Sequence, residues 1–292
     1  MAATQVVVGT DGSAPAQTAV GQAAREAKDH GVALRVVHAI DWVPPPGIAA
    51  VLNETGERTL RATGERLLAE AVSAARLVAP DIEITRTLSM ADPRSLLTEL
   101  SRGALVTVVG DSGTSGIASG LLGSVSRHLT AHAASPVLVV RTASAPEGPI
   151  VLGVDGSRPG ETAIEFAFVE AAARNERLTA VHVWSEWSSQ PAPPADPALP
   201  FAKAPGELAG DEERLLAEAL SGWSSRYPQV AVDRRSVKGR ARQSLIEASR
   251  SAQLLVVGSR GAGGFAGLRL GSVSAALLHH AHCPVAVVRA RE

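Results

Sequence analysis

The sequence predicts an α/β protein made of two tandem open five-stranded parallel sheets, each flanked by helices. Three observations carry this prediction. The chain has 292 residues, about the length of two domains. Its first half is repeated by its second half, and short β-branched runs alternate with Ala-, Leu-, Glu- and Arg-rich stretches of helical period. Such alternation is typical of βαβ units around a parallel sheet.

The repeat sets the domain boundary. The segment VVVGTDGS at 6–13 returns as IVLGVDGS at 150–157, and SPVLVVR at 135–141 returns as CPVAVVR at 283–289. Between the copies, residues 143–149 are rich in Pro, Gly and small residues, which are typical of a linker. We therefore expect one domain over residues 1–145 and a second over residues 146–292.

Each element follows from its local pattern. The β-branched runs predict strands at 5–9, 33–40, 83–88, 104–110 and 136–141, and in the second copy at 149–154, 177–184, 231–237, 253–258 and 284–289. Stretches of helical period predict helices at 14–30, 56–78, 93–102 and 124–133, with equivalents at 158–174, 209–226, 241–250 and 272–281. A Pro-rich excursion at 185–206 predicts a surface loop.

Composition narrows the class of protein. A hydrophobic content of 45% and a charged content of 20% are typical of a globular protein, and a net charge of -1 lacks the basic excess that favours nucleic acid or anionic lipid. No apolar run approaches the roughly 20 residues of a membrane span. No Lys or Arg precedes Arg25, unlike a secretory signal. The single cysteine, Cys283, agrees with a reducing compartment. We expect a cytoplasmic protein with no nucleic-acid or membrane partner.

Two glycine-rich loops carry the functional signal. The pattern G-x-x-G, nine residues, G-S follows the fourth predicted strand of each copy, at 110–124 and 258–272. Glycine lets backbone N–H groups approach an anion, and Gly-Ser at the start of a helix offers N–H groups without intrahelical acceptors at the positive end of the dipole. In open parallel sheets, ligands bind at the carboxyl ends of the strands. The pattern therefore predicts a phosphate-binding site in each copy.

A carboxylate follows the first strand of each copy, next to the predicted loop. Asp11 and Asp155 stand where they can accept hydrogen bonds from a ribose or base, or help to hold a cation. Hydroxyl groups in the next helix can add hydrogen bonds to phosphate oxygens, namely those of Ser124, Ser126, Ser272 and Ser274. In the alternative interpretation, the glycines only make tight turns and the serines are ordinary N-caps. Repetition of the whole arrangement favours the binding site.

Together these motifs resemble the ATP-binding branch of the universal stress protein family. The resemblance rests on the D-G-S turn, the V-H-x strand end, the spaced glycine pattern and the closing P-V-x-V-V, and it covers nearly the whole chain twice. It implies an adenine-nucleotide α-hydrolase-like sheet of order 3-2-1-4-5 in each domain. It further implies ATP bound at the point where the strand order reverses, and a homodimer of two-domain chains. Mg²⁺ is a candidate companion of the bound ATP.

The resemblance also implies site residues by position. In the first copy these are Gly9, Thr10, Asp11, Ala39, Gly110, Gly113, Gly123, Ser124, Val125 and Ser126. In the second copy they are Gly153, Val154, Asp155, Val183, Gly258, Gly261, Gly271, Ser272, Val273 and Ser274. The first loop has Asp111 and Ser112 where the second has Ser259 and Arg260. This difference removes a cation and adds an anion beside the triphosphate, so we expect the first site to bind ATP more weakly.

Histidines and the cysteine carry weaker signals. His279 and Cys283 have the i, i+4 spacing of two metal ligands on one helix face, but the cluster is not repeated in the first copy, so we expect no metal site. His38 and His182 end the second strand of their copies, where they either touch a ligand or are satisfied core histidines.

The motifs favour a regulator over an enzyme. No Walker A sequence, G-x-S-x-G elbow or H-E-x-x-H pair occurs, so we expect no catalytic residues. The leading hypothesis is an ATP-binding, nucleotide-responsive regulator in stress or growth arrest. Two alternatives stay open: a slow Mg²⁺-dependent ATPase or phosphotransferase in which Asp11 or Asp155 holds the metal-bound triphosphate, and a nucleotide-free, chaperone-like protein.

Overall fold

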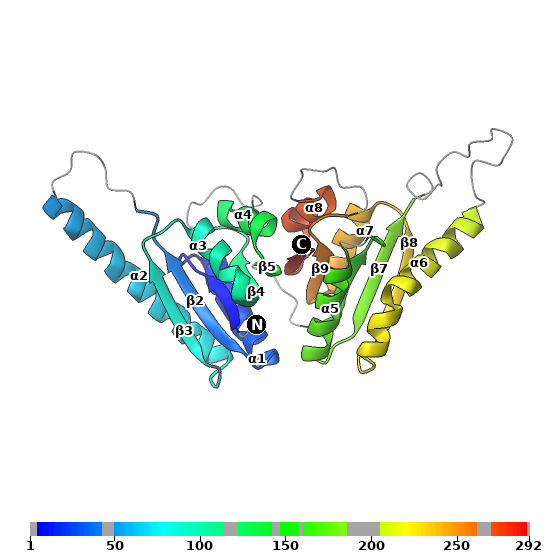
Figure 1. Ribbon diagram of the computed structural model, residues 1–292, viewed down its shortest axis with the longest axis horizontal. Helices are drawn as coiled ribbons and strands as arrows, with labels where there is room; N and C mark the ends of the chain where they lie inside the picture. The colour runs from blue at the N-terminus through cyan, green and yellow to red at the C-terminus, as the bar shows by residue number, and fades with distance from the viewer. Residues whose placement is uncertain are drawn as a thin grey trace. The chain divides into compact units, whose positions relative to one another are not determined.

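The computed structural model describes residues 5–42, 50–113, 122–141, 147–157, 160–185, 205–261 and 270–290. The chain divides into two compact units, Met1–Ser144 and Ala145–Glu292, and each holds a parallel sheet covered by helices (Figure 1). Most of the predicted Pro-rich loop and linker, and the middle of both glycine-rich loops, lie outside the described residues. Within the described ranges, no helix has the length and apolar character needed to cross a membrane.

Unit 1 alternates strands and helices in the predicted order. Its elements are β1 (Gln5–Gly9), α1 (Ala14–Asp29), β2 (Ala33–Ala39), α2 (Ala50–Val78), β3 (Ile84–Ser89), α3 (Pro93–Leu100), β4 (Ala104–Gly110), α4 (Ser124–His132) and β5 (Val137–Val140). Unit 2 repeats this order with β6 (Ile150–Val154), α5 (Glu161–Ala173), β7 (Leu178–Trp184), α6 (Pro205–Arg226), β8 (Val232–Lys238), α7 (Ala241–Ala248), β9 (Leu254–Gly258), α8 (Ser272–His280) and β10 (Val285–Val288).

Both sheets are parallel and have the predicted strand order. In unit 1 the order is β3-β2-β1-β4-β5, and in unit 2 it is β8-β7-β6-β9-β10, which is 3-2-1-4-5 counted from the first strand of each unit. The first and fourth strands are neighbours, with Val8 beside Val108 in unit 1 and Leu152 beside Val256 in unit 2. The order reverses between these two strands, so the loops that follow them meet at one edge.

The crossover connections decide which face each helix covers. Connections from β1 to β2 and on to β3 run one way along the sheet, and those to β4 and β5 run the other way. Because parallel crossovers are right-handed, α1 and α2 cover one face and α3 and α4 cover the other. Strands covered on both faces are apolar throughout, as in β1, where Val6, Val7 and Val8 are fully buried.

Two helices begin earlier than the sequence predicts. α2 begins at Ala50 and not at residue 56, and α6 begins at Pro205 and not at residue 209. Proline suits the first turn of a helix because its missing N–H has no intrahelical acceptor there. The end of the Pro-rich excursion is therefore already helical. The other helices and strands agree with the prediction to within about three residues.

Candidate functional site

The carboxyl ends of β1, β2 and β4 enclose a cavity of about 190 Å³ in unit 1. Every first-copy residue predicted for the site lines this cavity: Gly9, Thr10, Asp11, Ala39, Gly110, Gly113, Gly123, Ser124, Val125 and Ser126. Six lining residues were not predicted: Ala16, Val37, Pro93, Leu97, Val109 and Ser112. The fold therefore brings predicted residues from distant parts of the chain to one place.

A tight turn after β1 orients the carboxylate of Asp11. Its Oδ1 accepts a hydrogen bond from the Ser13 N–H at 3.0 Å. Gly12 has a φ of 81°, in the left-handed region that favours glycine. Ser13 then caps α1, because its hydroxyl accepts a hydrogen bond from the Ala16 N–H. The backbone of its own turn therefore holds the Asp11 carboxylate in place.

β2 supports this turn from the side. The Thr10 N–H donates to the Val37 carbonyl at 2.9 Å, and Nδ1 of His38 lies 2.8 Å from the Thr10 carbonyl. Because a carbonyl only accepts, His38 Nδ1 carries the hydrogen. Of the two alternatives for His38, the structure shows a satisfied histidine that holds the strand end carrying Asp11.

Two glycines of the first loop are required by close contacts. A Cβ at Gly113 would lie 2.5 Å from Oδ2 of Asp11, and a Cβ at Gly110 would lie 2.9 Å from the backbone carbon of Pro15. A larger residue at either position would have to displace the carboxylate or the start of α1. The glycines therefore let the loop close onto the carboxylate.

The N-terminus of α4 contributes hydrogen-bond donors to the same cavity. α4 begins at Ser124 with Gly123 as its N-cap, so the alternative in which a serine caps this helix is wrong. The Gly123 N–H donates to the Asp111 carbonyl at 2.7 Å and closes the loop onto the helix. Backbone N–H groups in the first turn of a helix have no intrahelical acceptor and lie at the positive end of its dipole. Ser124 and Val125, which line the cavity, can therefore donate to an anion there.

Two of the serine hydroxyls predicted to meet phosphate donate to backbone carbonyls in this arrangement. The Ser126 hydroxyl donates to the Gly110 carbonyl at 2.6 Å, and the Ser274 hydroxyl donates to the Gly258 carbonyl at 2.7 Å. A hydroxyl has a single hydrogen, so neither group can also donate to a phosphate. Both serines instead tie the start of a helix to the end of the neighbouring strand.

The extra charge of the first loop has a partner. The Asp111 carboxylate lies 3.7 Å from Nε of Arg141, and both side chains are largely buried, with 20% and 22% of their surface exposed. It also accepts a hydrogen bond from the Ser112 hydroxyl at 3.1 Å. Arg141 therefore offsets part of the negative charge that Asp111 brings to the loop.

Unit 2 repeats the main contacts of this site. Oδ1 of Asp155 accepts hydrogen bonds from the N–H and hydroxyl of Ser157 at 3.0 and 2.7 Å. A Cβ at Gly261 would lie 2.6 Å from Oδ2 of Asp155. Gly271 is the N-cap of α8, and its N–H donates to the Ser259 carbonyl at 2.7 Å. The same combination of carboxylate, glycine and helix start therefore occurs at the second sheet edge.

The remaining second-copy residues lie on the elements that the repeat predicts. Gly153 and Val154 end β6, Val183 lies near the end of β7, Gly258 ends β9, and Ser272 and Val273 begin α8. Arg260, one of two arginines in the second loop where the first loop has none, is exposed.

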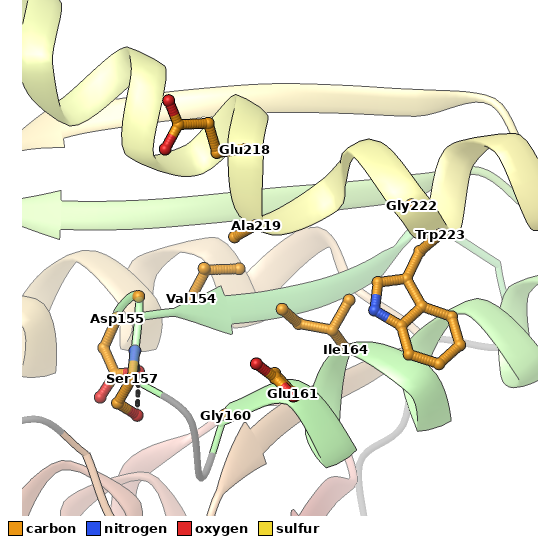
Figure 2. Close-up of a pocket in the computed structure, with 11 residues that line it drawn as sticks. Val154, Asp155, Ser157, Gly160, Glu161, Ile164, Glu218, Ala219, Gly222 and Trp223 are labelled. Carbon is orange, nitrogen blue, oxygen red and sulfur yellow. Dashed lines mark hydrogen bonds between the residues drawn. The ribbon is translucent and has the colours of Figure 1, made fainter.

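A second cavity, of about 220 Å³, lies between α5 and α6 of unit 2 (Figure 2). Among its lining residues, Val154 and Asp155 belong to the predicted site. Figure 2 shows the apolar side chains of Ile164 and Trp223 beside this space, with Ala219 on α6 above it. This cavity lies on the face that α5 and α6 cover, and its walls differ from those of the unit 1 cavity.

Cys283 belongs to the core. It is fully buried, and burial raises its pKa to about 12. The neutral thiol therefore packs as a small apolar group, as predicted.

α3 adds a wall to the unit 1 cavity that the sequence pattern did not predict. Pro93 and Leu97 line it, and a Cβ at Gly9 would lie 2.8 Å from Cδ1 of Leu97. The start of α3 was predicted, but its place over β1 depends on the crossover that brings the chain back from β3 to β4.

Comparisons with known proteins agree with the resemblance. The profile of the universal stress protein family matches residues 3–141 and again 148–289. Universal stress protein MT2052 of Mycobacterium tuberculosis (strain CDC 1551 / Oshkosh) is 40% identical over 303 residues, which cover 97% of this chain and 94% of that protein. The crystal structure of a universal stress protein from Archaeoglobus fulgidus DSM 4304 covers 100% of both chains with a TM-score of 0.65 at 19% identity, and so supports the fold. A shorter universal stress protein, crystallised in complex with cAMP, is 30% identical and covers 49% of this chain and 100% of its own, with a TM-score of 0.37. The chain therefore belongs to the universal stress protein family and carries two copies of its domain.

Proposed function

We propose that this protein binds ATP at the carboxyl edge of both sheets and acts as a nucleotide-responsive regulator in stress or growth arrest. The observation that best supports the proposal is the unit 1 cavity, where the Asp11 carboxylate and the N-terminus of α4 face one space. A carboxylate accepts hydrogen bonds from ribose hydroxyls or base amines, and a helix N-terminus favours phosphate. The two groups therefore match the two ends of a nucleotide.

The wall of the cavity suits an adenine ring. Val37, Leu97 and Val109 give it an apolar surface beside the polar groups of the turn. Binding sites for small ligands combine such a surface with a few well-placed polar groups. The same residues would hold the flat base while the loop backbone holds the phosphates.

Mg²⁺ would accompany ATP as its counter-ion. Of the described residues that line the cavity, Asp11 carries the one carboxylate, and Mg²⁺ is usually held by one or two carboxylates together with phosphates and water. The donor set therefore fits a metal that arrives with the nucleotide. When bound, Mg²⁺ would neutralise part of the phosphate charge.

The cavity favours binding over rapid turnover. Phosphoryl transfer needs cationic groups aimed at the transferred phosphate. Among the described residues lining the unit 1 cavity there is no Lys or Arg. ATP would then act by occupying the site and shifting the equilibrium between forms of the protein.

The nucleotide content of freshly purified protein tests the proposal. After heat denaturation, chromatography of the supernatant is expected to show ATP at up to two molecules per chain. ADP with released phosphate would support the slow ATPase instead. Protein without nucleotide that also fails to bind added ATP would contradict the proposal and favour the chaperone-like alternative.

Separate titrations of Asp11→Ala and Asp155→Ala test whether the two sites differ. Because Asp111 adds partly offset negative charge to the first loop, we expect unit 1 to bind ATP several-fold more weakly. Asp155→Ala should then remove the tighter phase and Asp11→Ala the weaker one. Equal losses in the two variants would reject the difference. Asp111→Ser, which copies the second loop, should strengthen the weaker phase.

We also propose that two chains pair as a homodimer, as the family resemblance implies. Light scattering with and without ATP measures this directly. A monomer at every concentration would reject it.

A further inference from the structure

A buried pair of side chains distinguishes the strand-end histidine of unit 2. Nε2 of His182 lies 2.6 Å from Oε2 of Glu212, with 7% and 11% of the two side chains exposed. The other ring nitrogen, Nδ1, lies 2.8 Å from the Val154 carbonyl. Val154 directly precedes Asp155. The imidazole therefore bridges α6 to the strand end that carries the candidate site.

The same helix position in unit 1 is a glycine. Gly12 packs on Leu67 of α2, as Gly156 packs on Leu215 of α6, so these two leucines align the helices. Three residues before each leucine stand Gly64 in unit 1 and Glu212 in unit 2.

An apolar side chain fills this space in unit 1. A Cβ at Gly64 would lie 2.6 Å from Cδ1 of Leu88 and 2.9 Å from Cδ2 of His38. His38 still makes the inner hydrogen bond, to the Thr10 carbonyl. Leu88 therefore occupies the region over the ring that the Glu212 side chain occupies in unit 2.

The neighbouring strand shows the matching exchange. In the sheet register, Leu88 of β3 stands beside His38, and Ser236 of β8 stands beside His182. Unit 2 thus has a large helix residue and a small strand residue where unit 1 has the reverse. The Ser236 hydroxyl oxygen is buried without a hydrogen-bond partner among the described residues. The pair Glu212 and Ser236 in unit 2 has about the same total volume as the pair Gly64 and Leu88 in unit 1. The side chain that packs over the histidine ring is ionisable in unit 2 and apolar in unit 1.

The geometry requires an additional hydrogen in unit 2. The Val154 carbonyl only accepts, so Nδ1 of His182 carries a hydrogen. A 2.6 Å contact between Nε2 and a carboxylate oxygen requires a second hydrogen between them. Because Gly64 has no side chain, the His38 ring receives no such partner from this position. Hydrogen bonds in which one partner is ionised are roughly twice as strong as neutral ones.

We propose that His182 and Glu212 form a positioning pair for the nucleotide site of unit 2. Glu212 fixes the ring through a charge-assisted hydrogen bond, and the ring fixes the Val154 carbonyl and so the turn that presents Asp155. The consequence for ligand affinity rests on the proposed function, whereas the shared hydrogen stands on the contact geometry. Unit 1 has the hydrogen bond from the histidine ring to the strand-end carbonyl, but it has Gly64 where unit 2 has the carboxylate of Glu212.

Side-chain NMR of the full chain tests the shared hydrogen without any nucleotide. Wild type should show a downfield, slowly exchanging proton that couples His182 to Glu212. Glu212→Gln keeps the shape of the side chain, but its amide NH₂ can donate to Nε2, so the ring should lose its Nε2 proton. The double variant Glu212→Gly/Ser236→Leu copies unit 1 and should make the His182 spectrum resemble that of His38. A wild-type spectrum without this proton overturns the inference.

ATP titration tests the positioning role. In an Asp11→Ala background, which isolates unit 2, Glu212→Gln should weaken ATP binding about fivefold, the ratio expected on replacing a charge-assisted bond by a neutral one. In an Asp155→Ala background, the same substitution should leave unit 1 affinity unchanged. Unchanged unit 2 affinity overturns the positioning role. If wild type binds no nucleotide, the proposed function fails together with that role, and the NMR result still decides whether the pair exists.

Discussion

The helix layers of the two units differ more than their strand ends do. In unit 1, Ala24, Ala75 and Ala79 are buried where α1 and α2 cover the sheet. When the two units are aligned on the contacts Gly12–Leu67 and Gly156–Leu215, the residues at the matching positions of unit 2 are Phe168, Trp223 and Tyr227. The three rings stack with centroids 5.9 to 6.4 Å apart. Unit 2 therefore has three aromatic rings that pack together where unit 1 has three alanines.

The difference shows which parts of the fold tolerate change. The side chains of a helix layer need only fill the space between the helices and the sheet. Small residues and aromatic rings are therefore both acceptable if neighbouring positions change together. The cavity beside Trp223 shows that the ring packing leaves space. At the sheet edge, Gly113 and Gly261 both lie against an aspartate, where a Cβ would come within 2.6 Å of an oxygen. A larger residue there would have to displace the carboxylate, and both units have the same arrangement.

The largest expected effect is on the aromatic cluster. Phe168→Ala removes a fully buried ring that stacks on Trp223 and Tyr227, and should lower the free energy of unfolding of unit 2 by about 3–5 kcal/mol. Urea unfolding followed by tryptophan fluorescence measures it, since Trp184 and Trp223 lie in this unit. Leu77→Ala, at a side chain that is 88% exposed, is the control and should change little. A loss below about 1 kcal/mol for Phe168→Ala would contradict the role of the cluster.

The next effect concerns the conserved arrangement at the sheet edge. Gly113→Ala should push the Asp11 carboxylate out of place and weaken ATP binding in unit 1 about 10- to 100-fold, as expected for losing a hydrogen bond to a charged group. Gly261→Ala should do the same in unit 2. Calorimetric titration measures both. The control is Gly21→Ala in α1, where a Cβ meets no atom within 4 Å and affinity should be unchanged. Normal binding by either loop variant would show that its aspartate is not a ligand.

Two helical glycines should respond in opposite directions. Gly64→Ala introduces a Cβ 2.6 Å from Leu88, and overpacking of about 1–3 kcal/mol should exceed the gain in helix propensity of about 1 kcal/mol. Gly222→Ala meets no atom within 4 Å and should stabilise α6 by about 1 kcal/mol. Hydrogen exchange read by mass spectrometry assigns each change to its unit. Changes of the same sign would reject the proposed difference between the helix layers.

The smallest effect concerns the cap of α3. Asp92 accepts hydrogen bonds from the N–H and hydroxyl of Ser95, whereas Arg240 at the start of α7 makes no side-chain cap. Asp92→Ala should lower the free energy of unfolding by about 1 kcal/mol. The free energy of unfolding of Arg240→Ala should lie within about 0.5 kcal/mol of the wild-type value.

The same cap predicts a pH dependence. Slight burial acts to raise the pKa of Asp92, but the hydrogen bonds from Ser95 and Arg94 outweigh it and lower that pKa from 3.8 to about 2. Since the folded-state pKa is the lower one, the stabilisation is present above the unfolded value and disappears as the pH falls through the folded value. Unfolding of wild type and Asp92→Ala should therefore converge in acid. A constant difference down to about pH 2 would contradict this assignment.

Much of the fold followed from local pattern. Apolar runs such as residues 254–257 predicted buried strands, and the repeat predicted that both halves share one topology. In a parallel sheet whose strand order reverses between the first and fourth strands, the loops after these two strands meet at one edge. The spacing of Gly110, Gly113 and Gly123 consequently selected residues that do line one cavity.

Sequence by itself determined the elements, their order and the residues at the sheet edge, because hydrophobic period and turn chemistry act over a few neighbouring residues. Tertiary structure alone decided which donor meets which acceptor. The Ser126 hydroxyl donates its hydrogen bond to the Gly110 carbonyl, and Glu212 contacts His182, which lies 30 residues away in the chain. Such partners are chosen when helices settle on a sheet, and a shift of one helical turn would exchange them, so no local pattern encodes them.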